Sequence, residues 1–310
     1  ALLFAANRLI NNNDILRSFF TEDDKGELNQ TISEQLPLNF ERREISCSPI
    51  KTTIQINKFI EQIKNHQFNL MEPPLYKFGL LKYSVDKYIF AINFHHIISD
   101  AKTADMVVNG ISENYNDYIS GKFIINNKKS ELIEDYLSYE ENDICENIEA
   151  DLVYWERFLK NVKLNVALSG GDRREAGKGK LVYFELDLNT SGEVKSFVRK
   201  QRSSIFLILA VLYSVLLSRY FNQEEILLCY PVNIRPAKFR NLFGCFINNV
   251  PCKIDVTEDV SFDELIKEFT IQRKSSKQHQ RCPFHKIIQR IRKTGQIKDQ
   301  NFFNVSIAET

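Results

Sequence analysis

The sequence predicts an α/β protein, in which helices and sheets pack in layers. Strand-like and helix-like segments alternate along both halves of the chain, and this alternation is typical of helices packed against a sheet. Apolar residues make up 43% and charged residues 26% of the 310 residues, a composition that excludes disordered, collagen-like and coiled-coil proteins. The length is long for one domain and short for three, so we expect two structural units.

The N-terminal segments predict two helices followed by a pair of strands. Residues 1–20 and 57–66 have apolar residues at helical spacing. Residues 75–82 and 87–94 predict two strands joined by a short turn at 84–86. The second strand is apolar on both faces, which predicts a central strand that is covered on both sides.

A further helix is expected soon after the second strand, because apolar residues return there at helical spacing. Ser99 or Asp100 is its natural N-cap, and Gly121 is its natural end. Residues 122–131 are polar and predict a loop, whereas residues 132–160 predict more helix.

The C-terminal half follows the best candidate for a linker, residues 169–180, which hold four glycines and no large apolar residue. The elements expected after it are a strand at 180–188, a buried helix at 203–220, a buried strand at 225–232, a helix that opens with a capping box at 261–264 and ends near 279, and a strand at 302–308.

Charge and cysteine content exclude several classes of function. Lys plus Arg total 41 and Asp plus Glu total 40, a formal charge of +1, so nothing indicates a nucleic acid or an anionic membrane as partner. The six cysteines form no CxxC and no cluster with zinc spacing, so we expect no metal site. Cys229 lies in an apolar run and is expected to be buried and reduced, which favours a cytoplasmic protein. The longest apolar run, 205–217, is too short to span a bilayer.

The strongest chemical signal is a pair of histidines at the end of the second strand, in the pattern HHxxxD formed by His95, His96 and Asp100. Adjacent residues of a strand point to opposite faces, so one imidazole would face a cleft while the other packs inward. An imidazole near its unperturbed pKa accepts a proton from an amine or a hydroxyl at neutral pH. The alternative is a structural histidine followed by an aspartate that only caps a helix.

The flanking sequence resembles the condensation domains of nonribosomal peptide synthetases, which belong to the chloramphenicol acetyltransferase-like acyltransferases. The similar segments occur in the family's order over nearly the whole chain. They are Asp14–Phe20, Phe68–Leu70 with Pro74–Leu75, His95–Asp100, Asp135–Tyr136, Tyr154–Trp155, Tyr230–Arg235, Phe243–Pro251, and His279–Gln280 with Pro283–Phe284.

The resemblance implies a fold and a reaction. The fold would consist of two chloramphenicol acetyltransferase-like lobes in a V-shaped pseudo-dimer with the active site between them. We expect an N-terminal lobe at 1–168, the linker at 169–180 and a C-terminal lobe at 181–310 that is incomplete, with the family's first strand also missing. Donor and acceptor peptidyl carrier domains would deliver phosphopantetheine arms, and an acceptor amine would attack the donor thioester to form an amide. No cofactor would be bound intrinsically, and an adenylation domain would be a neighbour.

The resemblance also implies residue roles. His96 would be the catalytic imidazole, His95 would be structural, and Asp100 would pair with Arg235 to hold the loop. Ser99, Ala101 and Asn248 would lie near the substrate tunnel, although a strand asparagine that bonds backbone is an equal alternative for Asn248. Ala101 replaces the family's usual glycine; it would narrow the tunnel if the arm passes it, and it would be harmless in a first helical turn.

Other functions remain open on the sequence alone. An epimerization domain shares both histidines but needs a second base, which we do not identify. A free-standing acyltransferase that uses coenzyme A or carrier thioesters is the enzymatic alternative, and an inactive condensation-like recruitment domain is the non-enzymatic one. Retention of both histidines favours catalysis, and it disfavours the cyclization relatives, which replace the histidines with aspartate.

Overall fold

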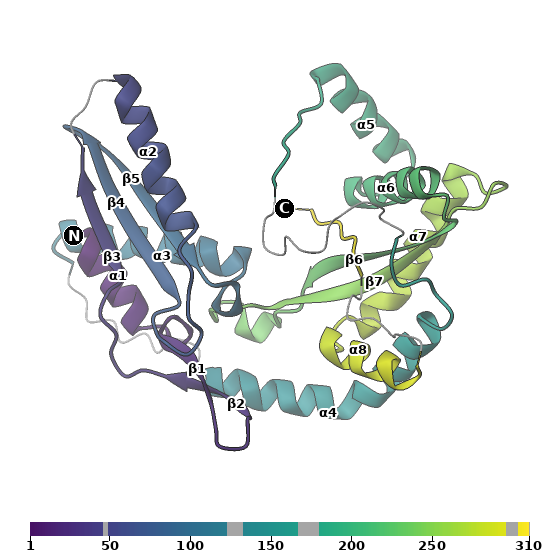
Figure 1. Ribbon diagram of the computed structural model, residues 1–310, viewed down its shortest axis with the longest axis horizontal. Helices are drawn as coiled ribbons and strands as arrows, with labels where there is room; N and C mark the ends of the chain where they lie inside the picture. The colour runs from purple at the N-terminus through teal and green to yellow at the C-terminus, as the bar shows by residue number, and fades with distance from the viewer. Residues whose placement is uncertain (46–48, 123–132, 167–179, 296–302, 310) are drawn as a thin grey trace. The chain divides into compact units, whose positions relative to one another are not determined.

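The computed structural model describes residues 1–45, 49–122, 133–166, 180–295 and 303–309 (Figure 1). They form two compact units, the first made of 1–141 with 235–246 and the second of 142–234 with 247–310. Most of the predicted linker at 169–180 lies outside the described residues, so the predicted lobe boundary stays a prediction. The units differ from the predicted lobes in two stretches, since 142–166 packs in the second unit and 235–246 packs in the first.

The first unit contains a sheet with strand order β3-β4-β5 and a separate hairpin, β1-β2. Strand β4 runs parallel to β3 and antiparallel to β5. The described strands of this unit are β1 (Ser18–Glu22), β2 (Leu28–Ile32), β3 (Phe40–Glu44), β4 (Tyr76–Ser84) and β5 (Lys87–Phe94). The predicted strand pair is therefore confirmed, but β4 is the central strand of the described sheet and β5 lies at its edge.

Helices cover the β3-β4-β5 sheet of the first unit. The described helices are α1 (Leu2–Asn11), η1 (Asp14–Arg17), α2 (Pro49–Lys64), η2 (His96–Ile98), α3 (Ala101–Ile119), η3 (Ala237–Phe239) and the start of α4 (Ile133–Phe158). The helix predicted over 1–20 ends at Asn11, and a strand begins at Ser18. The polar residues 11–14 explain this early end, because Asn and Asp side chains compete for backbone hydrogen bonds.

Alternating side chains of β4 give the sheet two apolar faces. Leu81 packs in a cluster with Phe59 and Ile63 of α2. Tyr76 and Phe78, which point to the opposite face of β4, belong to the large cluster that also contains apolar residues of α1 and α3. The prediction that β5 is central is wrong, because β5 lies at the edge of the described sheet, but apolar packing reaches both of its faces, with Ile89 beside the α2 cluster and Phe90 beside the α1 and α3 cluster.

The second unit is built around the antiparallel pair β6-β7, in which Cys229 lies opposite Pro251. Its described elements are the end of α4, then α5 (Leu188–Lys200), α6 (Ile205–Phe221), β6 (Glu225–Asn233), β7 (Ile247–Asp255), α7 (Phe262–Ser276), η4 (Lys277–His279) and α8 (Phe284–Lys293). The core includes Trp155 and Phe269, both about 1% exposed. The predicted helix 203–220 and strand 225–232 are confirmed, as is the capping box at Ser261.

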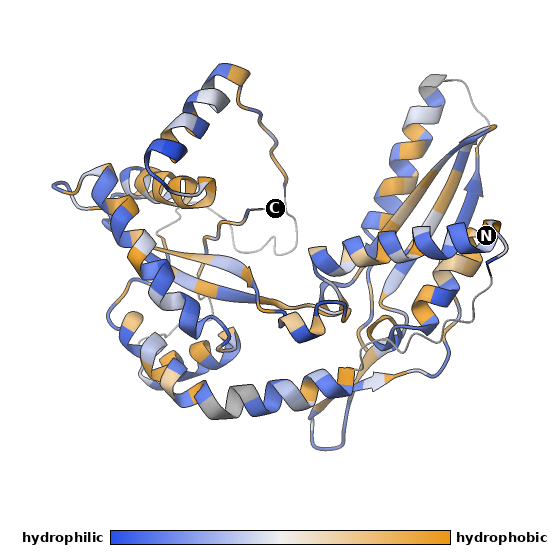
Figure 2. Ribbon diagram, turned by 180° about the vertical axis from the view of Figure 1, so that it is seen from behind, coloured by the Kyte–Doolittle hydropathy of each residue, from blue (hydrophilic) through white to orange (hydrophobic). Residues whose placement is uncertain are grey.

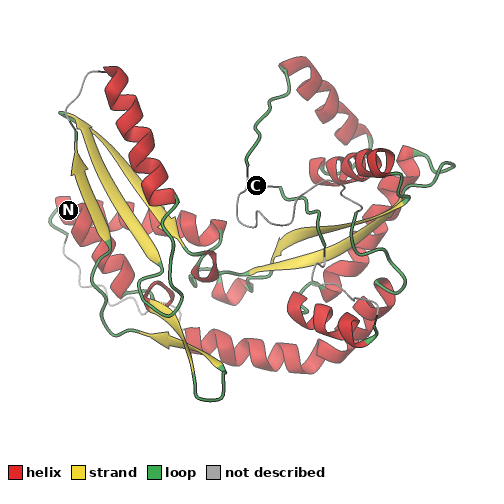
Figure 3. Cartoon of the chain, viewed as in Figure 1, coloured by secondary structure: helices red, strands yellow, loops and turns green. Residues whose placement is uncertain are grey.

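Three expectations for the second unit are wrong. Residues 180–187 form no strand but an exposed loop that leads into α5, a helix the sequence did not predict (Figure 3). Helix α6 is apolar along most of its length (Figure 2), yet its side chains at 205, 209, 212 and 216 are at least 36% exposed, so it is buried on one side only. The described residues after 302 make a single bridge, between Ser306 and Cys229.

No single helix among the described residues combines the length and the apolar character needed to cross a membrane. The bent pair α5 and α6, with 105° between the two helices, meets that test only when both are taken together.

Candidate active site

His95 and His96 lie just beyond the end of β5, where the chain turns into the short helix η2. The backbone N–H of His95 donates to Leu75 O at 2.9 Å. The His95 Nδ1 atom accepts from the N–H of Ile97 at 3.1 Å, which requires an Nδ1 without a proton. The Phe68 ring meets the half-buried His95 ring edge-on, with 6.2 Å between centroids. His95 is therefore anchored on its backbone and on its ring.

His96 is exposed and begins η2. Its Nδ1 lies 3.5 Å from Cys245 Sγ, so Nε2 is the ring nitrogen left to address a substrate. The two imidazoles differ in exposure, as expected. The cause is not the alternation of side chains along a strand, which the sequence suggested. The turn at η2 separates them, because both residues follow the last residue of the strand.

Asp100 is buried and connects three parts of the first unit. Its Oδ1 accepts from the N–H of Thr103 at 2.7 Å and caps α3. Its Oδ2 accepts from the N–H of Phe246 at 3.1 Å. Arg235 Nη2 donates to both carboxylate oxygens at 2.9 Å, and the Arg235 and Asp100 side chains are only 4% and 1% exposed. The contact that the resemblance implied between these residues is present in the structure.

The pair does not have the two parallel bonds of a fork-to-fork arrangement. One nitrogen of Arg235 serves both oxygens, while Nη1 donates to the carbonyl of Leu242. The guanidinium also lies over the Phe246 ring, 4.0 Å from its centroid, a favourable cation–π geometry. The arginine is thus held by a charge, a backbone carbonyl and an aromatic face, all within the first unit.

Thr103 and Gly244 join α3 to the segment 235–246. The Thr103 hydroxyl donates to Gly244 O at 2.7 Å and accepts from the Gly244 N–H at 3.1 Å. Gly244 has φ of +146°, and a Cβ there would lie 3.0 Å from the Phe246 ring, so glycine is required. Residues 244 and 246 are both pinned, and residue 245 between them is therefore held opposite His96.

The three predicted tunnel residues differ in their surroundings. Ser99 is buried, and its hydroxyl donates to His95 O at 3.3 Å. Ala101 is exposed and is the first residue of α3, where alanine is a good helix former. Asn248 lies on β7 in the second unit and bonds backbone groups with its whole amide: Nδ2 donates to the carbonyls of Gln280 and Cys282, and Oδ1 accepts from the N–H of Phe284. Their role beside a tunnel stays a prediction.

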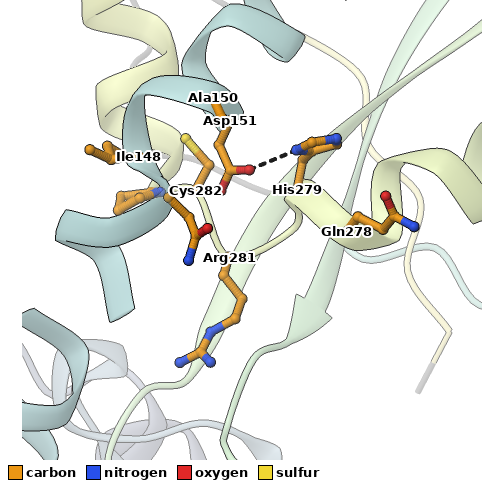
Figure 4. Close-up of a pocket in the computed structure, with 9 residues that line it drawn as sticks. Ile148, Ala150, Asp151, Gln278, His279, Arg281 and Cys282 are labelled. Carbon is orange, nitrogen blue, oxygen red and sulfur yellow. Dashed lines mark hydrogen bonds and ion pairs between the residues drawn. The ribbon is translucent and has the colours of Figure 1, made fainter. Parts of the chain in front are cut away.

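A second histidine–carboxylate pair lies in the second unit, beside a cavity of about 350 Å³ (Figure 4). His279 Nδ1 lies 2.6 Å from Asp151 Oδ1. The Tyr154 ring stacks on the imidazole at 3.9 Å, and Trp155 Nε1 donates to His279 O at 3.1 Å. Burial and the charge of Asp151 raise the pKa of the Cys282 thiol to about 12. Because the three α4 side chains clamp one histidine, we assign this cluster to packing of α4 against the turn before α8.

Sequence reasoning missed four residues of the site: Thr103, Gly244, Cys245 and Phe246. Segment 243–251 was singled out only through its resemblance, which says nothing about which side chains meet His96 or Asp100. The one local signal was Thr103, a polar residue on the buried side of an otherwise amphipathic helix. Among the described residues, no group of three His, Cys, Asp or Glu side chains is placed to hold a metal ion.

Comparison with known proteins gives a family match. The model of a family described as "Condensation domain" matches residues 1–309. The chain is 25% identical over 300 residues to gramicidin S synthase 2 of Aneurinibacillus migulanus, and 24% identical over 298 residues to tyrocidine synthase 3 of Brevibacillus parabrevis. Each alignment covers 93% of this chain, but they cover only 6% and 4% of the two synthases.

Solved structures share the fold. The X-domain from teicoplanin biosynthesis superposes with a TM-score of 0.83 at 17% identity and covers 98% of this chain and 68% of its own. The first condensation domain of the calcium-dependent antibiotic synthetase gives 0.79 at 15% identity, with 99% of this chain and 71% of its own covered. The predicted α/β fold class is therefore confirmed.

Proposed function

The chain belongs to the condensation domain family of nonribosomal peptide synthetases, and from this premise we propose that it catalyses formation of an amide bond. An amine carried by an acceptor attacks the carbonyl carbon of an acyl or peptidyl thioester carried by a donor. The new C–N bond forms, the C–S bond breaks, and the amine proton ends on the departing thiol. His96 is the catalytic residue of this proposal.

The observation that carries the proposal is the exposed imidazole of His96 on a turn whose neighbours are fixed. His95 is anchored through its ring and its N–H, and Asp100 is buried in hydrogen bonds. An exposed Nε2 on a rigid support holds an amine in position and accepts its proton as the C–N bond forms, or donates to the oxyanion of the tetrahedral intermediate. General acid–base catalysis of this kind typically contributes about 10²- to 10⁴-fold in rate.

The proposed substrates arrive as thioesters on other proteins. The curated relatives are many times longer than this chain, which supports the proposal that the domain works beside carrier and adenylation domains. Phosphopantetheine belongs to the carrier domains and enters as part of the substrate. A cytoplasmic location is part of the same proposal.

Two alternatives differ from the proposal in what they require of His96. A free-standing acyltransferase would use the same histidine but accept a coenzyme A thioester. A recruitment domain would bind a partner protein without needing His96. A His96 variant assayed with a carrier-bound donor and with a coenzyme A donor therefore distinguishes the three functions.

The deciding experiment compares wild type with His96→Ala in the full-length protein, using loaded donor and acceptor carrier domains and product detection by mass spectrometry. We expect the variant to lose amide formation, by about 10²-fold or more, while its binding of carrier domains is unchanged. His285→Ala, an exposed histidine on α8, is the matched control and should retain activity. Full product formation by His96→Ala would disprove the catalytic role, and equal turnover of a coenzyme A donor would favour the free-standing acyltransferase.

A further inference from the structure

Cys245 is the side chain that contacts the Nδ1 atom of His96. The Sγ–Nδ1 distance of 3.5 Å suits a hydrogen bond to sulfur, whose radius exceeds that of oxygen. Both residues are exposed on the same surface of the first unit. The contact joins residues 149 positions apart, so it exists only because the fold brings segment 235–246 against the turn after β5.

The backbone on both sides of Cys245 is fixed by the residues that also fix the histidine turn. Gly244 is bonded through its N–H and its carbonyl to Thr103. Phe246 is bonded through its N–H to Asp100, four residues after His96. One buried carboxylate therefore sets the position of the imidazole and of the thiol at once. A cysteine on a loop without these flanking hydrogen bonds would not be held against His96.

The direction of this hydrogen bond decides which nitrogen of His96 carries the proton. A thiol is a weak donor and its sulfur a weak acceptor. If sulfur accepts from Nδ1–H, Nε2 keeps its lone pair and is ready to take a proton from an amine. The same contact then persists after proton uptake, because the imidazolium still carries a proton on Nδ1. A hydrogen bond to one ring nitrogen is the usual way in which the tautomer at the other is fixed.

We propose that Cys245 is a positioning residue for His96: its sulfur accepts a hydrogen bond from Nδ1–H, orients the ring and leaves the Nε2 lone pair toward the substrate. The catalytic part of this assignment rests on the proposed function. The hydrogen bond between Cys245 and His96 does not depend on activity. Cys245 itself touches no reacting atom and forms no covalent intermediate in the proposal.

The first test reads the tautomer of His96 directly, by two-bond ¹H–¹⁵N correlation spectra of protein labelled with ¹⁵N-histidine. The chain has five histidines, and His96→Ala identifies the signal. We expect wild-type His96 to carry its proton on Nδ1 at a pH where the ring is neutral. Cys245→Ala should shift the population toward Nε2–H, and Cys245→Ser should shift it less because a hydroxyl also accepts. Arg240→Ala, an exposed residue of the same segment, should leave the tautomer unchanged.

The second test measures amide formation by the same variants. Loss of one hydrogen bond to a ring nitrogen predicts about a three- to tenfold lower rate for Cys245→Ala at unchanged affinity for carriers, with part of the rate restored in Cys245→Ser. The inference is overturned if neutral wild-type His96 carries its proton on Nε2, or if the tautomer population does not change in Cys245→Ala. If instead the tautomer depends on Cys245 while wild type forms no amide, the proposed function fails and the positioning contact stands.

Discussion

Arg235 Nη2 lies 2.9 Å from each carboxylate oxygen of Asp100, and the two residues are 135 positions apart in the sequence. Neither side chain is more than 4% exposed, so each charge depends on the other for compensation. Removing one partner of a buried pair leaves an uncompensated charge, and this is where the large energetic effect arises. Because Asp100 also bonds the segment that holds Cys245, the pair links folding stability to the geometry around His96.

Asp100→Asn should therefore reduce stability and activity together. The amide would place a donor against Arg235 or Phe246 N–H, and the guanidinium would stay buried without its counter-charge. We expect a loss of about 3 kcal/mol in the free energy of unfolding of the first unit, measured by hydrogen exchange of the α3 amides in the intact protein.

Glu44→Gln is the matched control for this substitution. Glu44 pairs with Lys82 at 2.8 Å at the surface, where the Glu44 side chain is 59% and the Lys82 side chain 30% exposed, and surface pairs contribute little. If Asp100→Asn exchanges as slowly as wild type, the buried pair does not hold α3 in place.

Cysteine reactivity should separate Cys245 from the buried cysteines. Burial raises the pKa of Cys229 to about 12, and burial together with the charge of Asp151 does the same for Cys282. A raised pKa keeps both thiols protonated well above neutral pH, and the thiolate is the reactive form. At pH 7 we expect maleimide to label Cys245 faster than Cys229 and Cys282, and labelling of those two to stay slow even at pH 9. Peptide mapping by mass spectrometry reads each cysteine separately. Labelling of Cys282 at the rate of Cys245 would contradict the burial.

The sequence predicted those parts of the fold that local patterns determine. The β4–β5 pair, the Asp100 cap of α3 and the capping box of α7 each depend on residues close together in the chain. The stretch 180–187 alternates like a strand, but a strand needs a partner, and the described residues provide none. Helix α5 was missed because Gly192 and a polar composition weaken its helical pattern.

The site was predictable only in part, for the same physical reason. The HHxxxD pattern marks its own location, and resemblance alone brought Arg235 to it. The contacts of Cys245 and Thr103 arise when segment 235–246 packs on α3, and no local pattern encodes that packing. The prediction that α6 is buried was wrong on one side of the helix. An apolar helix is buried on all sides only where other elements surround it, and several α6 residues are exposed.

Ala101→Gly tests whether the departure from the family's glycine matters. Ala101 is the exposed first residue of α3, where glycine would increase the entropy of the unfolded chain. We expect the variant to lose up to about 1 kcal/mol in stability and to show no gain in amide formation. A faster variant with an improved KM for the loaded carrier would instead place residue 101 against the phosphopantetheine arm.

Glu264 gives the second unit a defined pH dependence. Its carboxylate accepts from the Ser261 hydroxyl at 2.6 Å and the Ser261 N–H at 2.9 Å, and these bonds lower its pKa. A carboxylate whose pKa is lowered in the folded state adds stability when the pH is above its ordinary pKa. This added stability is lost as the pH falls through the lowered pKa. The stability gap between wild type and Glu264→Gln should therefore be greatest at neutral pH and should close as the pH falls below the ordinary pKa of a glutamate. Trp155 fluorescence follows unfolding of this unit, and Glu268→Gln, exposed on the same helix outside the capping box, is the matched control variant.

Asn248 should prove essential to the stability of the second unit. Its amide fills three backbone hydrogen bonds at residues 280, 282 and 284 while being only 8% exposed. Asn248→Ala leaves those buried groups unpaired, which should cost about 2 to 3 kcal/mol. Thermal unfolding followed by Trp155 fluorescence measures this loss, because Trp155 bonds the carbonyl of His279 at the start of the same turn. The neighbouring Asn249→Ala, which is exposed on β7, should unfold like wild type. If Asn248→Ala is as stable as wild type but forms amide poorly, the residue serves the substrate and not the turn.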